Sequence, residues 1–380
     1  MKFEIGLKAL TEALSVVSRA AAGKSPLRPI LANLLFAVES QDIQIVATDL
    51  EILLSSRLQA SIEAGGHFTI PAKLLLEVMS NIPAGTGKEK AVFELIDQQS
   101  NSILISCGRN KFNLQAQGIG DYPPVPVLSN EEFPRFDVSS KALKAGIHQA
   151  QIAIGGDDTN PMQRCLCMTF SDGNQLILIS TDTRRLAMTK VSNITYPKEF
   201  ERIFLVPARA VPEILKLLDE VEFINLGFFK QQLVFTTADY QLLTRLVEGK
   251  FPDYNKVIPK ESNKKLTINK EIFGQALKSV IPIARHSSSM VRLDIGANEL
   301  RVWSQSPEQG MSEVFIEAKF EGEPINIAFN AGFLQDFIGV VDGEQVSIDL
   351  TTPNYPGILK SADAASPFIY VAMPMTNFDQ

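Results

Sequence analysis

The sequence predicts an α+β protein made of three repeats of one domain, each with two helices and about eight short strands. The first observation behind this class is length: 380 residues, 45% of them hydrophobic, are too many for one ordinary core and suit two or three domains. The second is a strand-then-helix segment that occurs three times. We therefore expect domains at 1–129, 130–258 and 259–380.

A strand-like start followed by an amphipathic helix opens each repeat. The aligned starts are Phe3, Phe136 and Leu266, which lie 133 and 130 residues apart. A second strand leads into a second helix, and Pro71 and Pro207 suit such helix starts because the N–H that proline lacks is not needed there. The predicted helices cover about 7–21, 72–82, 141–154, 208–220, 270–284 and 331–341.

Short β-rich runs fill the sequence between the helices. Val46–Asp49 and Ile179–Asp182 end two of these runs in Thr-Asp, again 133 residues apart. The carboxylates could be catalytic, but their recurrence at one repeat position favours a structural turn. Residues 111–115 alternate polar and apolar, which predicts a half-buried strand. Proline-rich segments at 123–126 and 252–259 mark the two junctions.

The residues predict no catalytic, metal or cofactor site. Three cysteines cannot form a disulfide framework, and the Cys165–Cys167 pair lacks the second Cys or His cluster of a zinc site. None of the three histidines has the spacing of a nucleophile or metal partner. Residues 85–88 end like a phosphate loop, but Ile82 stands where its first glycine belongs and Glu89 replaces Ser or Thr. We expect Asp157–Asp158 to be solvated.

The formal charge of −7 does not suggest bulk attraction to nucleic acid. The acidity is concentrated in the third repeat, where residues 261–380 carry 9 basic and 15 acidic side chains. The six predicted helices carry 9 basic and 7 acidic residues, so they are net positive. A solvated helix face would explain this bias, but helices gathered on one side could also present it to phosphates.

The chain is expected to stay in the cytoplasm. No run reaches the roughly 18 apolar residues that a membrane span needs, and Glu4 stands where a signal peptide would be apolar. The three cysteines are accordingly expected to be reduced thiols in strands.

Several segments, taken in order, point to one family. They are Met1–Phe3, Pro29–Leu35, Ala47–Glu51, Thr181–Asp182, Arg185–Ala187, Gly249–Tyr254, Phe329–Asn330 and Tyr370–Met375. No single segment is decisive, but their order and spacing agree with the threefold repeat. Over essentially its entire length, the sequence resembles the bacterial DNA polymerase III beta subunits, the sliding clamps.

The resemblance implies the DNA clamp fold: three domains, each with two helices and two antiparallel sheets, and two chains joined head to tail in a ring. It implies a non-enzymatic processivity factor, without a cofactor, that encircles duplex DNA without sequence specificity and tethers the replicative polymerase. Further implied partners are the clamp loader and other polymerases and repair proteins with clamp-binding peptides. In the implied homodimer, Phe112 and Leu114 on an edge strand meet Pro282 and Ile283, although the first pair could instead pack inside the first domain.

The resemblance also places a hydrophobic pocket for partner tails between the second and third domains. Its residues are Leu166, Thr181, Arg185, Leu186, Pro252, Lys256, Val257, Phe333, Val371, Met373, Pro374 and Met375. Thr183-Arg184 depart from the family's usual Gly-His and are expected on the rim of this pocket. The residues predicted to face DNA are Lys8, Arg19, Lys24, Lys73, Lys141, Lys144, Arg209, Lys216 and Lys278.

Two other classes of function stay open from the residues. A nuclease or polymerase subunit would need clustered carboxylates to hold magnesium, and the sequence shows none outside the recurring turns. A protein-interaction scaffold built from repeats would never touch DNA. Among clamps, the archaeal and eukaryotic forms have two domains per chain, so three repeats favour the bacterial form.

Overall fold

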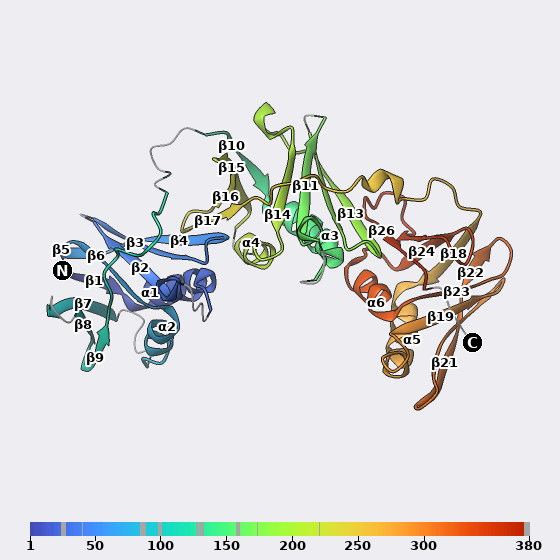
Figure 1. The fold of residues 1–380 in the computed structure, drawn as a ribbon, viewed down its shortest axis with the longest axis horizontal. Helices are drawn as coiled ribbons and strands as arrows, with labels where there is room; N and C mark the ends of the chain where they lie inside the picture. The colour runs from blue at the N-terminus through green and yellow to red at the C-terminus, as the bar shows by residue number, and fades with distance from the viewer. Residues whose placement is uncertain are drawn as a thin grey trace. The chain divides into compact units, whose positions relative to one another are not determined.

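The structure, a computed structural model, describes residues 1–375 apart from 24–27, 40, 84–88, 98–100, 127, 129–132, 157–159, 173 and 220. Its contacts divide the chain into two compact units (Figure 1). Unit 1 comprises Met1–Ser140 and Pro212–Leu246, and unit 2 comprises Lys141–Val211 and Val247–Gln380. Each unit contains two antiparallel sheets.

Unit 1 has a five-stranded sheet of order β5-β1-β7-β8-β9 and an eight-stranded sheet of order β10-β15-β16-β17-β4-β3-β2-β6. The first sheet consists of β1 (Lys2–Gly6), β5 (Ser61–Ala64), β7 (Lys90–Asp97), β8 (Ser102–Cys107) and β9 (Asn110–Gln115). The second consists of β2 (Asn33–Val38), β3 (Asp42–Thr48), β4 (Ile52–Gln59), β6 (Gly66–Pro71), β10 (Arg135–Ser139), β15 (Phe223–Phe229), β16 (Gln232–Thr236) and β17 (Tyr240–Arg245).

Unit 2 has a nine-stranded sheet of order β14-β11-β12-β13-β26-β25-β24-β18-β22 and a four-stranded sheet of order β21-β20-β19-β23. The first consists of β11 (Cys165–Ser171), β12 (Gln175–Thr181), β13 (Arg185–Ser192), β14 (Ile203–Pro207), β18 (Lys264–Asn269), β22 (Lys319–Glu321), β24 (Gln345–Leu350), β25 (Gly357–Ser361) and β26 (Ile369–Ala372). The second consists of β19 (Met290–Ile295), β20 (Glu299–Ser306), β21 (Gly310–Glu317) and β23 (Ile325–Asn330).

Each large sheet joins strands from two repeats. In unit 1, β4 pairs with β17 and places Leu53 opposite Leu243. In unit 2, β13 pairs with β26 and places Leu186 opposite Val371. The middle repeat therefore gives one set of strands to each unit, because its sheets continue into those of both neighbours. We call these two strand pairings the first joint and the second joint.

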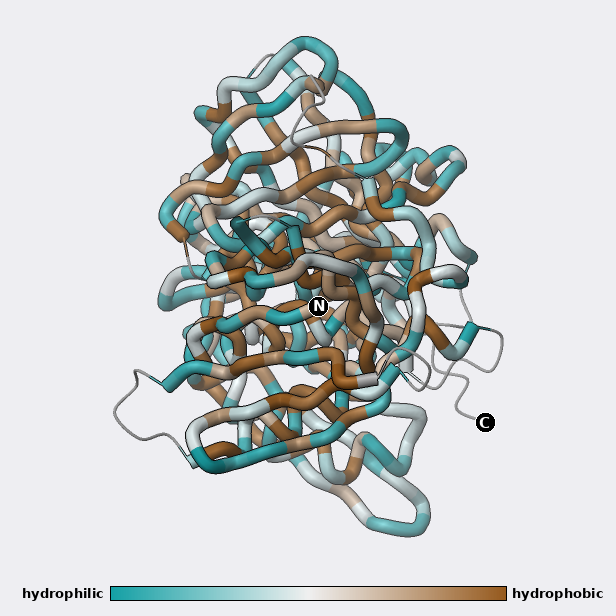
Figure 2. Tube along the Cα trace, turned by 90° about the vertical axis from the view of Figure 1, so that its left-hand side faces the viewer, coloured by the Kyte–Doolittle hydropathy of each residue, from teal (hydrophilic) through white to brown (hydrophobic). Residues whose placement is uncertain are grey.

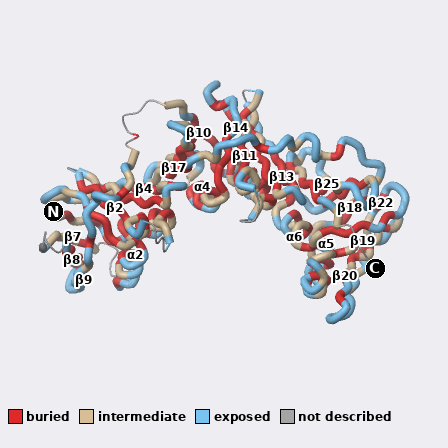
Figure 3. Tube along the Cα trace, viewed as in Figure 1, coloured by how far each residue is buried: buried red, intermediate tan, exposed pale blue. Residues whose placement is uncertain are grey.

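The helices pack on the sheets as amphipathic elements. They are α1 (Leu7–Val17), α2 (Ala72–Ser80), α3 (Ser140–Ala150), α4 (Val211–Leu218), α5 (Lys270–Ala284) and α6 (Ala331–Val340). Helix α1 contacts α2 and strands of both unit 1 sheets, and α5 contacts α6 and strands of both unit 2 sheets. Buried residues follow the strands and the helix faces turned toward them (Figure 3), whereas the projecting loops are mostly hydrophilic (Figure 2).

Aromatic and aliphatic side chains fill the cores of both units. In unit 1 the Phe3 and Phe93 rings stack with centroids 4.8 Å apart, and Phe36 lies 6.0 Å from Phe93. In unit 2 the buried face of α5, including Phe273 and Leu277, belongs to an extensive core cluster. Burying a side chain of this size is worth about 1.5–3 kcal/mol, so these helices are fixed by packing.

The α+β class and the six helices predicted from periodicity are confirmed, with one correction. Arg209 was expected on the fourth helix, but that helix begins at Val211 and Arg209 lies in the preceding turn. The physical reason is Pro212, which fits the first turn of a helix because the N–H that proline lacks would have no partner within the helix there. The predicted domain boundaries stay a prediction, and Ser129 lies outside the described residues.

Candidate binding pocket at the second joint

The Thr181–Arg185 turn leads into strand β13 at the second joint. The Thr181 hydroxyl donates to the Arg185 carbonyl at 2.8 Å, and the backbone N–H groups of Arg184 and Arg185 donate to Asp182 Oδ1, each at 2.9 Å. Thr183 has φ of 76°, in the left-handed region that is uncommon for a β-branched residue. The carboxylate and hydroxyl therefore hold the backbone in a conformation that the side chain of Thr183 opposes.

The same turn occurs at the first joint. The Thr48 hydroxyl donates to the Ile52 carbonyl at 2.7 Å, and Asp49 Oδ1 accepts from the N–H groups of Glu51 and Ile52. Leu50 has φ of 77°, matching Thr183 133 positions later. The prediction that the Thr-Asp pairs make structural turns is confirmed, because both carboxylates are engaged by their own backbone.

Arg185 is fixed from three sides. Its Nε donates to Asp182 Oδ2 at 2.9 Å, and its Nη1 donates to Asp336 Oδ2 on α6 at 2.5 Å. Its guanidinium carbon lies 4.4 Å from the centroid of the Phe333 ring. Because the side chain is only 13% exposed, these contacts are weakly screened and hold its position.

A pocket of about 160 Å³ opens beside this turn. Seven of the twelve predicted pocket residues line it: Thr181, Arg185, Leu186, Pro252, Val257, Val371 and Met373. Four further residues complete the lining, namely Gln163, Thr183, Arg184 and Tyr254. Thr183 and Arg184 are exposed, as expected for a rim. Tyr254 belongs to a segment that carried the family resemblance, whereas no motif singled out Gln163.

Leu166 does not line the pocket. Strand β11 alternates its side chains, and Cys165 and Cys167 pack in the cluster that contains Leu186 and Val371. Leu166 lies between them in sequence, so it points to the opposite face of the sheet, where it is fully buried. Its predicted role as a lining residue is therefore wrong, because a shift of one position along a strand reverses the face.

Four more predicted residues do not line the pocket. Phe333 lies against the Arg185 guanidinium, and exposed Lys256 pairs with Asp253 at 3.2 Å. Pro374 follows Met373 in the C-terminal segment. Met375 lines a different cavity of about 340 Å³, and Trp303 lines that cavity too.

The floor beneath the pocket is apolar. Leu186 and Val371 pack in a cluster with Cys165, Cys167 and Phe251. Burial raises the pKa of the Cys165 thiol to about 12 and that of the Cys167 thiol to about 11, so both stay protonated at neutral pH. Because both cysteines are buried in this cluster, they act here as small apolar residues.

At the first joint, a cavity of about 220 Å³ lies along β4 and β17, where Ser55, Ser56, Tyr240 and Gln241 line it. The Thr48–Ile52 turn is not part of its lining, and next to that turn apolar side chains pack together. There, Ile30, Leu53 and Val125 pack against a buried cluster of Leu35, Val46 and Tyr122. Ile30 holds the repeat position that Gln163 holds at the second joint. The same turn therefore borders packed apolar side chains in one case and a pocket in the other.

The predicted DNA-facing residues differ in what they contact. Arg19 Nε lies 3.1 Å from Glu213, which is buried, so this arginine ties the end of α1 to α4. Lys216 also pairs with Glu213, at 3.4 Å, and Lys8 lies 3.9 Å from Glu12. Lys73, Lys141 and Lys278 are exposed on their helices, and Lys144 is half-buried on α3. Arg209 lies in the turn before α4, and Lys24 lies outside the described residues.

The residues predicted at the dimer contact lie on one edge of each unit. Phe112 and Leu114 are half-buried on β9, the edge strand of the five-stranded sheet. Exposed Pro282 and half-buried Ile283 end α5, which packs on β21, the edge strand of the four-stranded sheet. Both edge strands carry unpaired backbone groups that could pair with another chain.

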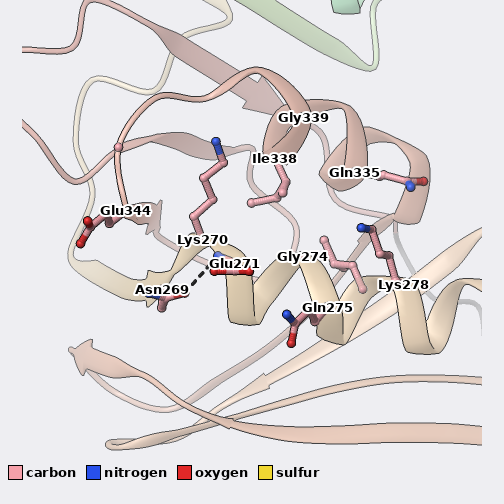
Figure 4. A pocket seen from close by; sticks show the side chains of 12 residues that line it. Asn269, Lys270, Glu271, Gly274, Gln275, Lys278, Gln335, Ile338, Gly339 and Glu344 are labelled. Atoms are coloured by element: carbon pink, nitrogen blue, oxygen red, sulfur yellow. Dashed lines mark hydrogen bonds between the residues drawn. The ribbon is translucent and has the colours of Figure 1, made fainter.

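A cavity of about 660 Å³ lies between α5 and α6 (Figure 4). Lys270 extends from the start of α5 to donate to the Val341 carbonyl at 2.5 Å, and Lys278 and Gln335 also line the cavity. Glu271 and Glu344 line the same cavity, so its lining carries carboxylates as well as lysines. In the described part of the chain, no group of three or more His, Cys, Asp or Glu could hold a metal ion, and no helix is long and apolar enough to cross a membrane.

Fold and pocket together define a class: a three-repeat α+β clamp with a small apolar pocket beside a strand joint. Three family models match in order, the DNA polymerase III beta subunit N-terminal domain at 1–126, its central domain at 137–253 and its C-terminal domain at 255–376. The chain therefore belongs to the DNA polymerase III beta subunit family.

Relatives match over the full length. The beta sliding clamps of Pseudomonas putida and Vibrio cholerae are 28% and 29% identical, and each alignment covers 99% of this chain and 100% of the relative. The crystal structure of the Pseudomonas aeruginosa DNA polymerase III subunit beta aligns with a TM-score of 0.90 at 26% identity, over 99% of this chain and 100% of that one. The Bartonella birtlesii sliding clamp bound to griselimycin aligns with a TM-score of 0.91, also at 26% identity and with the same coverage.

Proposed function

We infer that this chain is a DNA sliding clamp, the non-catalytic processivity factor of a replicative DNA polymerase. The observation that carries this function is the match of all three domain models in order over nearly the whole chain. A clamp keeps a polymerase on duplex DNA by topology, so it needs neither a catalytic site nor base recognition. Contacts with phosphates suffice, because they carry no sequence information.

The pocket at the second joint is proposed to bind the tail peptides of the polymerase, the clamp loader and repair proteins. Its walls offer Leu186, Val257, Val371 and Met373 to apolar side chains, and Met adapts to varied ligands. A volume of about 160 Å³ holds one large apolar side chain and leaves the rest of a tail on the surface. The solved clamp of Bartonella birtlesii, similar over the same length, is bound to griselimycin.

The proposed assembly is a cytoplasmic homodimer closed head to tail. One protomer presents the β9 edge with Phe112 and Leu114, and its partner presents the β21 edge beside Pro282 and Ile283. Such a heterologous contact repeats twice and closes into a ring. Exposed helix cations such as Lys73, Lys141 and Lys278 are proposed to act weakly and together on the DNA backbone.

Retention on DNA of two topologies tests the clamp function. After loading by a bacterial clamp loader, the protein should stay on a nicked circle and leave when the circle is cut. The same plasmid, linearised before loading, is the matched control. Equal retention on both forms would refute the ring, and cleavage of the DNA by the purified protein would favour the enzyme alternative.

A further inference from the structure

The charges around the pocket differ in whether they are already neutralised. Arg185 is bonded to Asp182 and Asp336, so its charge is engaged. Arg184 is exposed and lines the same pocket, and its side chain has no hydrogen bond or ion pair within the part of the chain that the structure describes. One guanidinium with five N–H donors is therefore available next to apolar walls.

The backbone of Arg184 is fixed although its side chain is not. Its N–H donates to Asp182 Oδ1 at 2.9 Å, and its carbonyl accepts from the Met373 N–H at 2.8 Å. The side chain consequently starts from a defined point between the turn and the C-terminal segment. A ligand whose apolar side chain fills the pocket must pass its neighbouring residue close to this point.

We propose that Arg184 selects partner tails that carry an acidic residue directly beside their apolar anchor. The inference rests on the proposed peptide-binding function and names the chemistry of its partners. A carboxylate is the group that matches a guanidinium fork, and the charge-assisted bond it makes is stronger than one to an amide. Because the site is exposed, we expect a preference of about fivefold, which corresponds to about 1 kcal/mol.

Fluorescence anisotropy with two labelled peptides tests this proposal. The peptides share one pair of apolar anchors and differ only in Asp or Asn beside them. The parent protein should bind the Asp peptide about fivefold more tightly at low salt, and the preference should shrink as salt rises. Arg184→Gln should bind both peptides equally, whereas Arg184→Lys should keep part of the preference.

Lys190→Gln is the matched control, since Lys190 is exposed on strand β13, which begins directly after Arg184, and its loss also removes one positive charge. It should keep the fivefold preference. An Asp preference that survives in Arg184→Gln, or that is absent from the parent, would overturn the role of Arg184 while leaving the pocket intact. Failure of the parent to bind either peptide would instead overturn the proposed pocket function.

Discussion

Replacing Thr183 by glycine should stabilise the protein, because this residue holds a left-handed conformation at φ of 76°. An L residue in that region costs about 1–2 kcal/mol, and a β-branched one is among the least suited. Glycine removes this cost but gains freedom in the unfolded chain worth about 0.4–1 kcal/mol. Thr183 is exposed, so little burial is lost. The balance is a gain of about 0.5–1 kcal/mol.

Thermal unfolding followed by circular dichroism measures this gain, which should raise the melting temperature by about 1–4 °C. Thr183→Ala keeps the Cβ atom and should gain much less. Leu50→Gly makes the same change in the equivalent turn, away from the pocket, and should also stabilise the protein. Its gain should be smaller by the burial energy of the leucine side chain, which is 39% exposed. A lower melting temperature for Thr183→Gly would show that the turn is not strained and refute the reasoning.

Three further outcomes are expected. Leu114→Glu or Ile283→Glu should give monomers by light scattering, since an unpaired charge at an apolar contact costs several kcal/mol, and an unchanged dimer would contradict the interface. Deleting the chain from Met373 onward should abolish tail-peptide binding, measured by fluorescence anisotropy, but leave the dimer intact. If Met373→Ala binds the peptide as tightly as the parent, the pocket residues that hold the tail are misassigned. Cys165 and Cys167 should resist thiol reagents until the protein unfolds. Their raised pKa values favour the protonated folded state, so stability should fall as pH rises above about 9.

Local patterns in the sequence predicted the local structure well. Helical periodicity gave α5 at its observed bounds, and the recurrence of Thr-Asp gave the two turns. The pairing of β13 with β26, by contrast, joins residues that lie far apart in the chain, and no local pattern specifies such a partner. The Arg185 contact with Asp336 was missed for the same reason, since 151 residues separate them.

The direction of a side chain within a strand is harder to predict than the strand itself. Leu166 was assigned to the pocket from the family resemblance, and the continuous apolar run of β11 does not itself show which residues face which side. Only the register with neighbouring strands decides this, through Cys167 opposite Ile179 and Leu166 opposite Val206. Because β11 is buried on both faces of the sheet, its sequence does not alternate between polar and apolar residues. Such an alternation would have shown that Leu166 faces away from the pocket.

The pocket arises from what is missing at the second joint. Both joints have the same Thr-Asp turn and the same apolar pair across the strands, Leu53 with Leu243 and Leu186 with Val371. Next to the turn of the first joint, Ile30 and Val125 pack against the buried cluster of Leu35, Val46 and Tyr122, so this region contributes to the core. At the second, Gln163 replaces the isoleucine and the apolar floor stays open, which costs burial within the chain. In the proposed function, an apolar side chain of a partner tail supplies that burial.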